Sequence, residues 1–466
     1  MGLRRVLATW AGKAGIWMLR AVGRGATTAP GRVVLALDPG FIRTAAREAR
    51  RTRVLVTGTN GKTTTSALLE AAMVADGWAV VRNASGANML AGIASALAER
   101  VGPWGSLAAD ALVAEIDEAT LPALTAALDA DVAVVTNFFR DQLDRFGELD
   151  RTVGYVRRGL AGVRGMVCLN ADDPLVADLA GDLAADARPL MYGVEPTAEN
   201  RLTGEEGLPP GLDTQFCPRC GERFEYTYRT YGHLGDYRCP GCGWARPTRE
   251  VLGTQLPGED AGIALEISFP EGASIRVQLG VPGLYNAYNA VAAAAAAFAT
   301  GVDLRAIREG LEGFAGAFGR MERLWVGDRE VVLALSKNPV GFDQILRAVV
   351  DDPGAGALVL GINDGIADGR DISWLWDVDF EVLLERGDLP VVASGRRAED
   401  MAVRLKYGDV AEDRIRVEND TMDGLEAALE ATPEGECAYA LLTYTAMLDL
   451  RARLQRRGLV GEMWRG

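Results

Sequence analysis

Short apolar runs alternate with helical stretches along the first half of the chain. Residues 53–57 form an apolar run that a glycine-rich turn follows, and residues 63–75 have the apolar spacing of a helix. Further apolar runs at 111–116, 132–136 and 166–169 are also separated by helical stretches. Short buried strands between helices are typical of a parallel sheet that helices cover on both faces. The pattern therefore predicts an α/β domain.

A second alternation begins near Glu330 and predicts a smaller doubly wound sheet. Its predicted strands are 331–335, 358–361, 391–394 and 439–443. A helix is expected from about Arg397, an alanine-rich helix at 290–300 returns to the first sheet, and residues 313–323 are the expected hinge.

The chain has 466 residues, and at about 150 residues per domain this length corresponds to about three units. The patterns above indicate where these units begin and end. The expected parts are an N-terminal helical segment (1–50), a central α/β domain (51–315) and a C-terminal α/β domain (316–466). Residues 205–250 are rich in Cys, Gly, Tyr and Pro and interrupt the alternation. We therefore expect them to form an insertion in the central domain.

The first 32 residues mix basic and apolar side chains at helical spacing, which predicts an amphipathic helix. Lys13 interrupts the apolar stretch and no small-residue cleavage site follows, so a signal peptide is not expected. Two interpretations stay open. The helix packs on the next domain, or its basic surface contacts anionic lipid.

The composition excludes several classes of protein. Apolar residues make up 48% of the chain and charged residues 24%, which excludes a disordered or fibrous protein. No uncharged apolar stretch approaches the roughly 18 residues of a membrane-spanning helix, so we expect a soluble protein. The 49 basic and 64 acidic residues give a net charge of −15. This charge argues against nucleic acid as a partner.

A phosphate-binding loop is predicted where the first strand meets the first helix, at Thr57-Gly-Thr-Asn-Gly-Lys-Thr-Thr-Thr65. The two glycines allow backbone N–H groups to turn inward, and the helix N-terminus adds its positive dipole end. Lys62 can neutralise phosphates and Thr63 can place a hydroxyl on Mg²⁺. The predicted nucleotide-binding residues of the loop are Gly58, Thr59, Asn60, Gly61, Lys62, Thr63 and Thr64.

Four of the six cysteines form two C-x-x-C pairs, Cys217-Pro-Arg-Cys220 and Cys239-Pro-Gly-Cys242. This spacing predicts a Zn(Cys)₄ ribbon, and four protein ligands make the metal structural. A disulfide pair and an Fe–S site are the alternatives. The only histidine, His233, lies inside the ribbon and is expected to be a surface or hairpin residue. Cys168 and Cys437 lie in apolar strands and are expected in the core.

Further segments resemble the Mur ligase and folylpolyglutamate synthetase superfamily. The segments are Ala114-Glu-Ile-Asp-Glu118, Thr136-Asn137, Arg140-Asp-Gln-Leu-Asp144, Asn170-Ala-Asp-Asp173, Gly283-Leu-Tyr-Asn-Ala-Tyr-Asn289 and Gly319-Arg-Met-Glu322. The resemblance implies a Mur ligase-type central ATP-binding domain with a smaller Rossmann-like C-terminal domain. It also implies that Glu115 is a catalytic Mg²⁺ ligand beside Thr63, and that Asn286, Asn289 and Arg320 lie at the nucleotide.

The chain departs from that superfamily at three points. Gln142 replaces the family's histidine, and no lysine occurs between Lys62 and Lys337 that could carry the carbamate of many Mur ligases. The usual Asp-x-x-His-Asn-Pro segment is present only as Leu335-Ser-Lys-Asn-Pro339. These departures leave the number of Mg²⁺ ions open.

The segment Asn363-Asp-Gly-Ile-Ala-Asp-Gly-Arg-Asp-Ile-Ser-Trp374, together with the cysteine ribbon, resembles the MurT family, the synthetase subunits of lipid II isoglutaminyl synthase. The resemblance implies ATP-dependent amidation of the α-carboxylate of D-Glu in the lipid II stem peptide, through an acyl phosphate. Ammonia would come from a GatD-type class I glutamine amidotransferase subunit, in a heterodimer. Asp371 is implied to orient a catalytic histidine of that partner. The implied location is cytoplasmic, at the inner face of the membrane.

Two other functions are compatible with parts of the sequence. One is a Mur or folate-type ligase that adds an amino acid, against which the Asp371 segment argues. The other is a catalytically silent ATP-binding scaffold or nucleic-acid-binding ribbon protein. The intact Lys62, Thr63 and Glu115 argue against the silent scaffold, and the net charge argues against nucleic acid.

Overall fold

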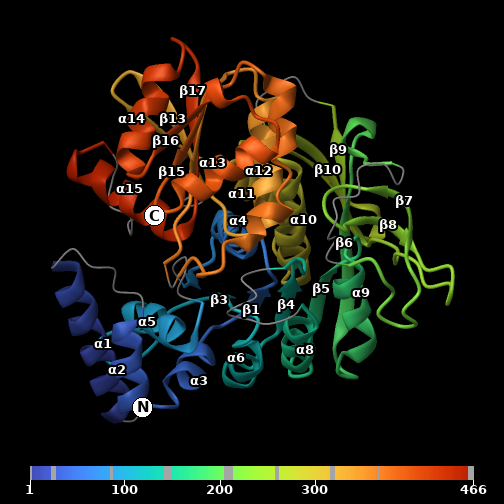
Figure 1. Cartoon of the computed structure of the whole chain (residues 1–466). Coiled ribbons are helices and arrows are strands. Elements are labelled where there is room, and N and C mark those ends of the chain that lie inside the picture. Colours follow the sequence, from blue (N-terminus) through green and yellow to red (C-terminus); the bar gives the residue numbers. More distant parts are fainter. Residues whose placement is uncertain are drawn as a thin grey trace. The chain divides into compact units, whose positions relative to one another are not determined.

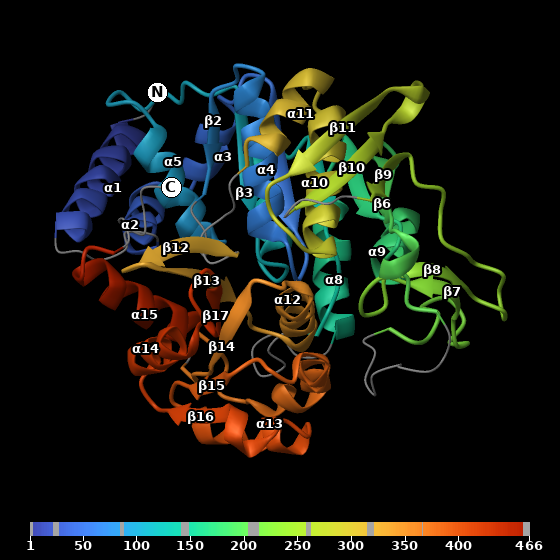
Figure 2. The ribbon, with the colours of Figure 1, turned by 90° about the horizontal axis from the view of Figure 1, so that it is seen from above.

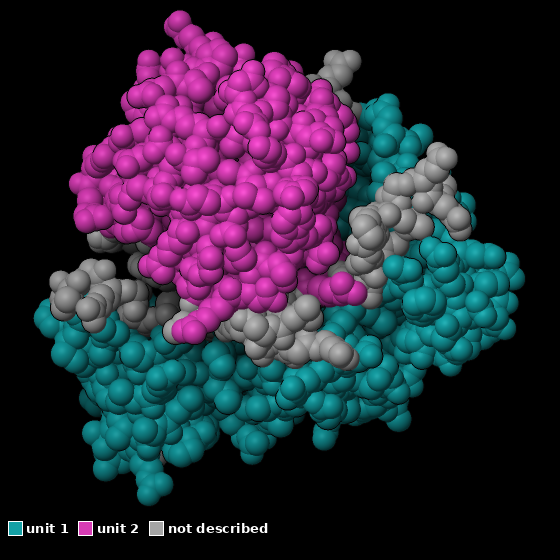
Figure 3. Space-filling model, in the orientation of Figure 1, with its two compact units in different colours: residues 1–138, 149–204, 214–315 teal, residues 139–148, 205–213, 316–466 magenta. Residues whose placement is uncertain are grey.

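The computed structural model describes residues 3–21, 28–83, 88–140, 149–203, 214–257, 262–314, 321–365 and 367–459. The chain divides into two compact units (Figure 3). Unit 1 comprises residues 1–138, 149–204 and 214–315, and unit 2 comprises residues 139–148, 205–213 and 316–466. Each unit is built around its own sheet (Figure 1).

Unit 1 contains a nine-stranded sheet. Its strands are β1 (Thr52–Thr57), β2 (Val80–Arg82), β3 (Ala111–Glu115), β4 (Val132–Val135), β5 (Met166–Asn170), β6 (Arg188–Glu195), β9 (Val251–Leu256), β10 (Ile263–Ser268) and β11 (Ser274–Leu279). They follow the order β11-β10-β9-β6-β5-β4-β1-β3-β2. Pairing is parallel from β2 across to β9, and antiparallel between β9, β10 and β11. The predicted strands are β1, β3, β4 and β5, and all four are confirmed.

Helices cover both faces of this sheet, as predicted for strands whose residues are buried throughout (Figure 1). The helices are α1 (Leu3–Ala21), α2 (Ala29–Leu37), α3 (Phe41–Ala46), α4 (Lys62–Ala75), α5 (Leu90–Arg100), α6 (Leu121–Leu128), α8 (Leu149–Leu160), α9 (Pro174–Asp178), α10 (Leu284–Ala299) and α11 (Leu304–Glu312). One large core joins α3, α5, α6 and α8 to the sheet, and α4, α10 and α11 pack against one another.

The carboxyl end of β1 is the position where this sheet favours a ligand. β2 and β3 lie on one side of β1 in the sheet, and β4 lies on the other side. The strand order therefore reverses its direction at β1. In open α/β sheets, ligands bind outside the carboxyl ends of the strands at such a switch point. The predicted phosphate loop follows β1 directly.

The N-terminal helix predicted from the sequence is α1. It packs on α2 and α5 through Ala8, Gly12 and Ile16. A Cβ on Gly12 would lie 2.7 Å from Val34 and 3.0 Å from Ala98, so the helices approach closely there. One face of the helix is therefore fixed to unit 1. Among the described residues, no helix combines the length and apolarity needed to cross a bilayer.

Unit 2 contains the predicted smaller sheet, with six strands. They are β12 (Glu322–Val326), β13 (Arg329–Leu335), β14 (Ala355–Gly361), β15 (Val391–Ser394), β16 (Ile415–Glu418) and β17 (Cys437–Leu442), in the order β12-β13-β17-β14-β15-β16. All pairs are parallel except β12 with β13. Its helices are α12 (Pro339–Asp351), α13 (Ala398–Tyr407), α14 (Thr421–Ala431) and α15 (Tyr444–Arg456). Two apolar clusters form its core.

Candidate functional site

The loop 58–61 joins β1 to α4 in a conformation that requires glycine at two positions. Gly58 has φ +119° and Gly61 has φ +86°, which are left-handed values that other residues rarely adopt. A Cβ on Gly58 would lie 2.2 Å from Thr136 Oγ1, and one on Gly61 would lie 2.1 Å from Asn289 Oδ1. The side chains of Thr136 and Asn289 thus lie so close to Gly58 and Gly61 that neither position has room for a Cβ.

Thr136 and Asn137, in the loop directly after β4, hold the phosphate loop in place. The Thr59 N–H donates to Asn137 O at 2.9 Å, and the Asn60 N–H donates to Asn137 Oδ1 at 2.9 Å. The hydroxyl of Thr136 donates to Asn60 O at 2.7 Å. Thr63 and Thr64 follow in the first turn of α4, where both are buried. The loop is therefore preorganised by the sheet that carries it.

Lys62 is buried at the start of α4 and its ammonium turns back over the loop. Its Nζ donates to Gly58 O and lies 2.8 Å from Glu118 Oε1. Burial opposes the charge, but the carboxylates of Glu118, Asp117 and Glu115 outweigh it, so the pKa of Lys62 is raised. The loop thus contains a charged ammonium, the group expected to contact the phosphates.

Glu115 ends β3 beside β1, where Val56 is its partner in the sheet. Asn83 fixes its backbone, because the Glu115 N–H donates to Asn83 Oδ1 at 2.8 Å and Asn83 Nδ2 donates to Glu115 O at 2.9 Å. The carboxylate is buried, and its Oε2 has no hydrogen-bond partner among the described residues. A buried carboxylate oxygen without a partner beside a phosphate loop fits a divalent cation. Thr63, the other predicted ligand, is buried in the first turn of α4.

The two predicted asparagines lie at the N-terminal end of α10. Asn289 reaches the phosphate loop, since its Oδ1 accepts a hydrogen bond from the Thr65 hydroxyl at 3.4 Å. Asn286 lies beside it, and its Oδ1 accepts from Asn289 Nδ2 at 3.3 Å. The structure therefore brings residues 58–65, Glu115, Asn286 and Asn289 to one region of unit 1. Arg320, the remaining predicted nucleotide ligand, and Gln142 lie outside the described residues.

The sequence-based site lacked Glu118 and Asn83. Glu118 is the buried counter-ion of Lys62, and Asn83 fixes the backbone of Glu115. A signal for Glu118 was present, because it is the second glutamate of the Glu-Ile-Asp-Glu segment that begins at Glu115. No local pattern pointed to Asn83, because it lies 32 residues before the residue it holds.

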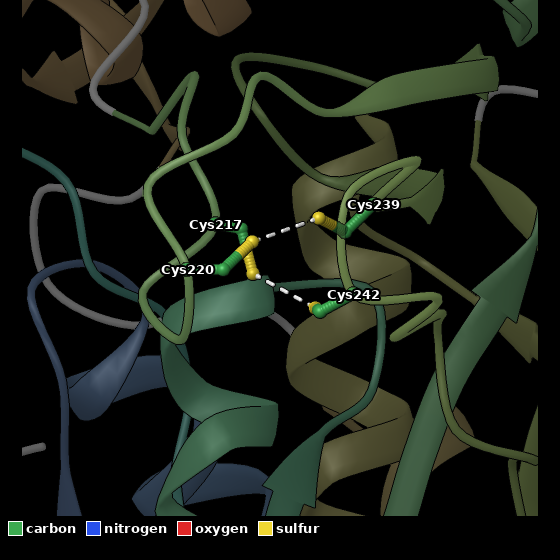
Figure 4. A group of neighbouring side chains, drawn as sticks. All are labelled: Cys217, Cys220, Cys239 and Cys242. Carbon is green, nitrogen blue, oxygen red and sulfur yellow. Dashed lines mark hydrogen bonds between the residues drawn. The ribbon is translucent and has the colours of Figure 1, made fainter.

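The four ribbon cysteines converge from two loops (Figure 4). Their sulfur atoms all lie within 4.8 Å of one another, with Cys217 and Cys242 at 3.7 Å and Cys220 and Cys239 at 3.4 Å. These distances exceed the roughly 2.05 Å of a disulfide bond and are near the roughly 3.8 Å between thiolates on tetrahedral zinc. The disulfide alternative is therefore wrong, and the donor set fits a metal ion.

The two C-x-x-C turns are built alike. The N–H groups of Gly221 and Gly243 donate to the carbonyls of Cys217 and Cys239, each at 2.9 Å. Both glycines have positive φ, at +78° and +73°. Phe224, Tyr226, Tyr237 and Trp244 pack beneath the cysteines. The ribbon thus has two equivalent C-x-x-C turns over one small aromatic core.

A hairpin of the ribbon, β7 (Glu225–Arg229) with β8 (Gly235–Arg238), packs on the Asn-Ala-Asp-Asp turn at 170–173. Of the two positions expected for His233, surface or hairpin, the hairpin is confirmed and the surface is wrong. Its side chain is fully buried in the hairpin turn, with Nε2 3.3 Å from Asp173 Oδ2. The same oxygen accepts the Phe138 N–H at 2.8 Å. The ribbon therefore supports the segment that holds the phosphate loop.

Asp371 lies in unit 2, in the loop after β14, and is exposed. Its Oδ1 accepts the Ser373 N–H at 2.9 Å, and hydrogen bonds from Ser373 lower the pKa of the carboxyl. By contrast, Asp368 is buried and accepts the N–H groups of Gly365 at 3.0 Å and Thr445 at 2.7 Å. Asp368 shapes the loop, and Asp371 presents an ionised carboxylate on the surface.

The fold and site define a class of protein. A family model described as the Mur ligase middle domain matches residues 56–207. Among solved structures, a pseudomurein peptide ligase type C from Methanothermus fervidus has a TM-score of 0.64 at 23% identity, covering 88% of this chain and 79% of that chain. The chain has the Mur ligase fold, as predicted, and that fold implies ATP and Mg²⁺.

Two relatives and a second family model narrow the class to one family. Residues 335–447 match the model described as MurT ligase C-terminal. The MurT subunit of lipid II isoglutaminyl synthase (glutamine-hydrolyzing) from Streptococcus pneumoniae (strain ATCC BAA-255 / R6) is 35% identical over 467 residues, 99% of both chains. The same subunit from Staphylococcus aureus (strain COL) is 32% identical over 437 residues, 94% of both chains. The chain belongs to the MurT family.

Proposed function

We infer that this chain is the ATP-dependent, amide-forming subunit of a lipid II isoglutaminyl synthase, in peptidoglycan biosynthesis. The reaction converts the α-carboxylate of D-Glu in the lipid II stem peptide to the amide of D-isoglutamine. The observation that carries the proposal is the near-complete alignment with MurT subunits, combined with an intact phosphate loop around Lys62.

Residues of unit 1 have different proposed roles in phosphoryl transfer. Gly58 and Gly61 allow the loop backbone to surround the phosphates, and Lys62 neutralises charge on the group being transferred. Thr63 and Glu115 would hold Mg²⁺, which supplies further positive charge at the phosphate oxygens. Asn286 and Asn289 would contact the nucleotide from α10, and Arg320, which belongs to unit 2, completes the proposed set. The activated carboxylate then reacts with ammonia, and phosphate leaves.

The cysteine ribbon is proposed to hold one structural zinc ion. Cys217, Cys220, Cys239 and Cys242 would supply all four ligands of a tetrahedral ion, which would leave no position open for chemistry. The ribbon is then an insertion, residues 205–250, in a central ATP-binding domain of residues 51–315. Residues 1–50 form the N-terminal helical segment and residues 316–466 the C-terminal domain.

Ammonia is proposed to come from a GatD-type glutaminase subunit. The relatives are named as subunits of a glutamine-hydrolysing enzyme, which implies a partner. The single histidine of this chain is buried against Asp173, so a histidine for glutamine hydrolysis must belong to the partner. The exposed carboxylate of Asp371 is proposed to orient that histidine. Both subunits would act in the cytoplasm, where lipid II meets the inner membrane face.

Co-expression with the glutaminase subunit tests the proposal directly. The purified complex is incubated with lipid II, ATP and glutamine, and the stem peptide is analysed by mass spectrometry. We expect amidation that requires both ATP and glutamine, and loss of amidation in Lys62→Ala with the complex still assembled. Incorporation of an amino acid instead of ammonia would favour a Mur or folate-type ligase. Full activity of Lys62→Ala would remove the phosphate-loop assignment.

A further inference from the structure

The outer face of α1 is apolar although it is exposed. Leu3, Leu7, Trp10, Ala14 and Trp17 follow one another at alternating intervals of four and three residues, which places them on one helix face. Leu3 is 75% exposed and Trp17 is 73% exposed. A helix at the surface of a soluble domain normally turns polar side chains outward. Here both the face packed on unit 1 and much of the outer face are apolar.

Neighbouring elements extend this apolar surface. Figures 1 and 2 show α1 and α2 side by side, and α2 exposes Val33 and Leu37. A Cβ on Gly105 would lie 3.6 Å from Arg5 and Val6, so the loop that carries Gly105 packs against the first turns of α1. Trp104, the residue before that glycine, is 79% exposed. We call the exposed side chains of α1, α2 and Trp104 the N-terminal face.

The segment that forms α1 and α2 carries only basic charges, although the whole chain carries −15. The first acidic residue is Asp38, and the residues before it contain Arg4, Arg5, Lys13, Arg20, Arg24 and Arg32. Arg5 is buried and paired with Glu48, whereas Arg4 and Arg32 are exposed. Basic side chains beside exposed tryptophans are the composition of helices that lie in the interface of anionic bilayers.

We propose that the N-terminal face docks this protein flat on an anionic lipid bilayer. Trp10 and Trp17 enter the interfacial region, and the exposed Arg4 and Arg32 contact the headgroups. The helix does not need to cross the bilayer, because its other face stays packed on unit 1. The inference rests on the proposed function only for its purpose, which is to bring the ATP site to a lipid-linked substrate.

Vesicle co-sedimentation tests the docking without any chemistry. The full chain is mixed with phosphatidylglycerol or phosphatidylcholine vesicles, alone and as the complex with its glutaminase subunit. The test variant is Trp10→Gln/Trp17→Gln. The matched control is Val403→Gln/Tyr407→Gln, an exposed apolar pair on α13. We expect binding to phosphatidylglycerol to weaken about tenfold or more in the test variant only, and to weaken with salt in the wild type. Unchanged thermal unfolding verifies that the variants fold.

Three outcomes would overturn the docking. The first is equal vesicle binding by the test variant and the wild type, and the second is absence of vesicle binding by the wild type. The third is that the wild type binds no vesicles but forms a concentration-dependent dimer or a partner contact, which the test variant loses. Amidation of detergent-solubilised lipid II separates this inference from the proposed function. The test variant should retain that activity and lose activity on vesicle-embedded lipid II, whereas an inactive wild type would contradict the proposed function alone.

Discussion

At the scale of single residues, the buried pair of Lys62 and Glu118 connects the stability of the chain to its nucleotide. The two charges are 2.8 Å apart and both side chains are almost fully buried. Glu118→Gln should lower the free energy of unfolding without nucleotide by about 2 kcal/mol, because a buried ammonium loses its counter-ion while the amide oxygen can still accept a hydrogen bond. ATP should then stabilise the variant more than the wild type, because the phosphates replace the lost charge.

Thermal unfolding with and without a non-hydrolysable ATP analogue measures both effects of the Glu118 change. Lys62→Met provides the comparison, since the losses in a double-mutant cycle should not add if the two side chains interact with each other. Weaker ATP stabilisation of Glu118→Gln would contradict the prediction and would indicate that Glu118 acts on the nucleotide or its metal.

At the same scale, Asp343 in α12 is expected to make the stability of the chain depend on pH. Burial and the nearby carboxylates of Asp379 and Glu381 raise its pKa to about 7, against the effects of Arg404 and a hydrogen bond from the Asp379 N–H. The unfolded chain releases this proton near pH 4, so the stabilising contribution of Asp343 is complete below that pH and is lost as pH rises towards 7. Asp343→Asn should therefore stabilise the chain at pH 8 and have little effect at pH 4.

We expect about 1–2 kcal/mol from Asp343→Asn at pH 8, because the side chain is partly exposed and solvent screens its charge. Asn can still accept the Asp379 N–H, so the change removes the charge and keeps the hydrogen bond. Urea unfolding at the two pH values measures the difference. A stabilisation that is equal at both pH values would exclude titration of Asp343 as its cause.

The residues that sequence reasoning located are those whose function depends on local structure. A phosphate loop is a strand, a turn and a helix in one short segment, so Gly58, Gly61 and Lys62 could be predicted from their order alone. Glu118 could not be assigned, because its contact with Lys62 joins positions 56 residues apart. The burial of His233 depends on a hairpin that packs on the turn at 170–173. No local pattern contains that contact.

At the scale of elements, the predictions succeeded for strands that are buried on both faces. They missed β6, β9, β10 and β11, which form one end of the nine-stranded sheet. β3 and β4 are continuous apolar runs, whereas β10 alternates buried and partly exposed residues. β6 and β9 are neighbours in the sheet, but the cysteine ribbon separates them in sequence. Their pairing therefore depends on how the insertion folds, which residue periodicity does not reveal.

This arrangement predicts that a metal ion held by the ribbon would affect ATP binding at the phosphate loop. Arg246, just after the second C-x-x-C pair, lies 3.2 Å from Asp172 Oδ1, and the ribbon's His233 contacts Asp173. Purified protein should contain about one zinc per chain. Its removal by a chelator should loosen the turn at 170–173 and weaken ATP binding by about fivefold, a coupling of about 1 kcal/mol.

Metal analysis, calorimetry with ATP and limited proteolysis measure the three effects of zinc. Re-addition of zinc should restore ATP affinity, which separates metal loss from irreversible unfolding. ATP affinity that is identical with and without zinc would show that the ribbon does not support the phosphate loop. Freshly purified protein without zinc would contradict the ribbon assignment itself.

At the scale of the whole molecule, the proposed phosphoryl transfer and the proposed contact with the glutaminase depend mainly on different units. Unit 1 contains the phosphate loop, and unit 2 presents Asp371 on the loop after β14, at the edge where ligands meet an open α/β sheet. Asp371→Asn should lower glutamine hydrolysis in the assembled complex by about 10²-fold or more, because an amide orients a neighbouring imidazole without stabilising its positive charge. ATP binding to the phosphate loop should not change.

Asp377→Asn is the matched control, since Asp377 is another exposed aspartate in the same segment. Ammonia supplied directly should restore amidation in Asp371→Asn, because the defect would lie in producing ammonia and not in activating the carboxylate. If ammonia does not restore amidation, Asp371 acts on the substrate of this chain. If glutamine hydrolysis is unaffected, the partner has a complete catalytic set of its own, and the exposed carboxylate has another role.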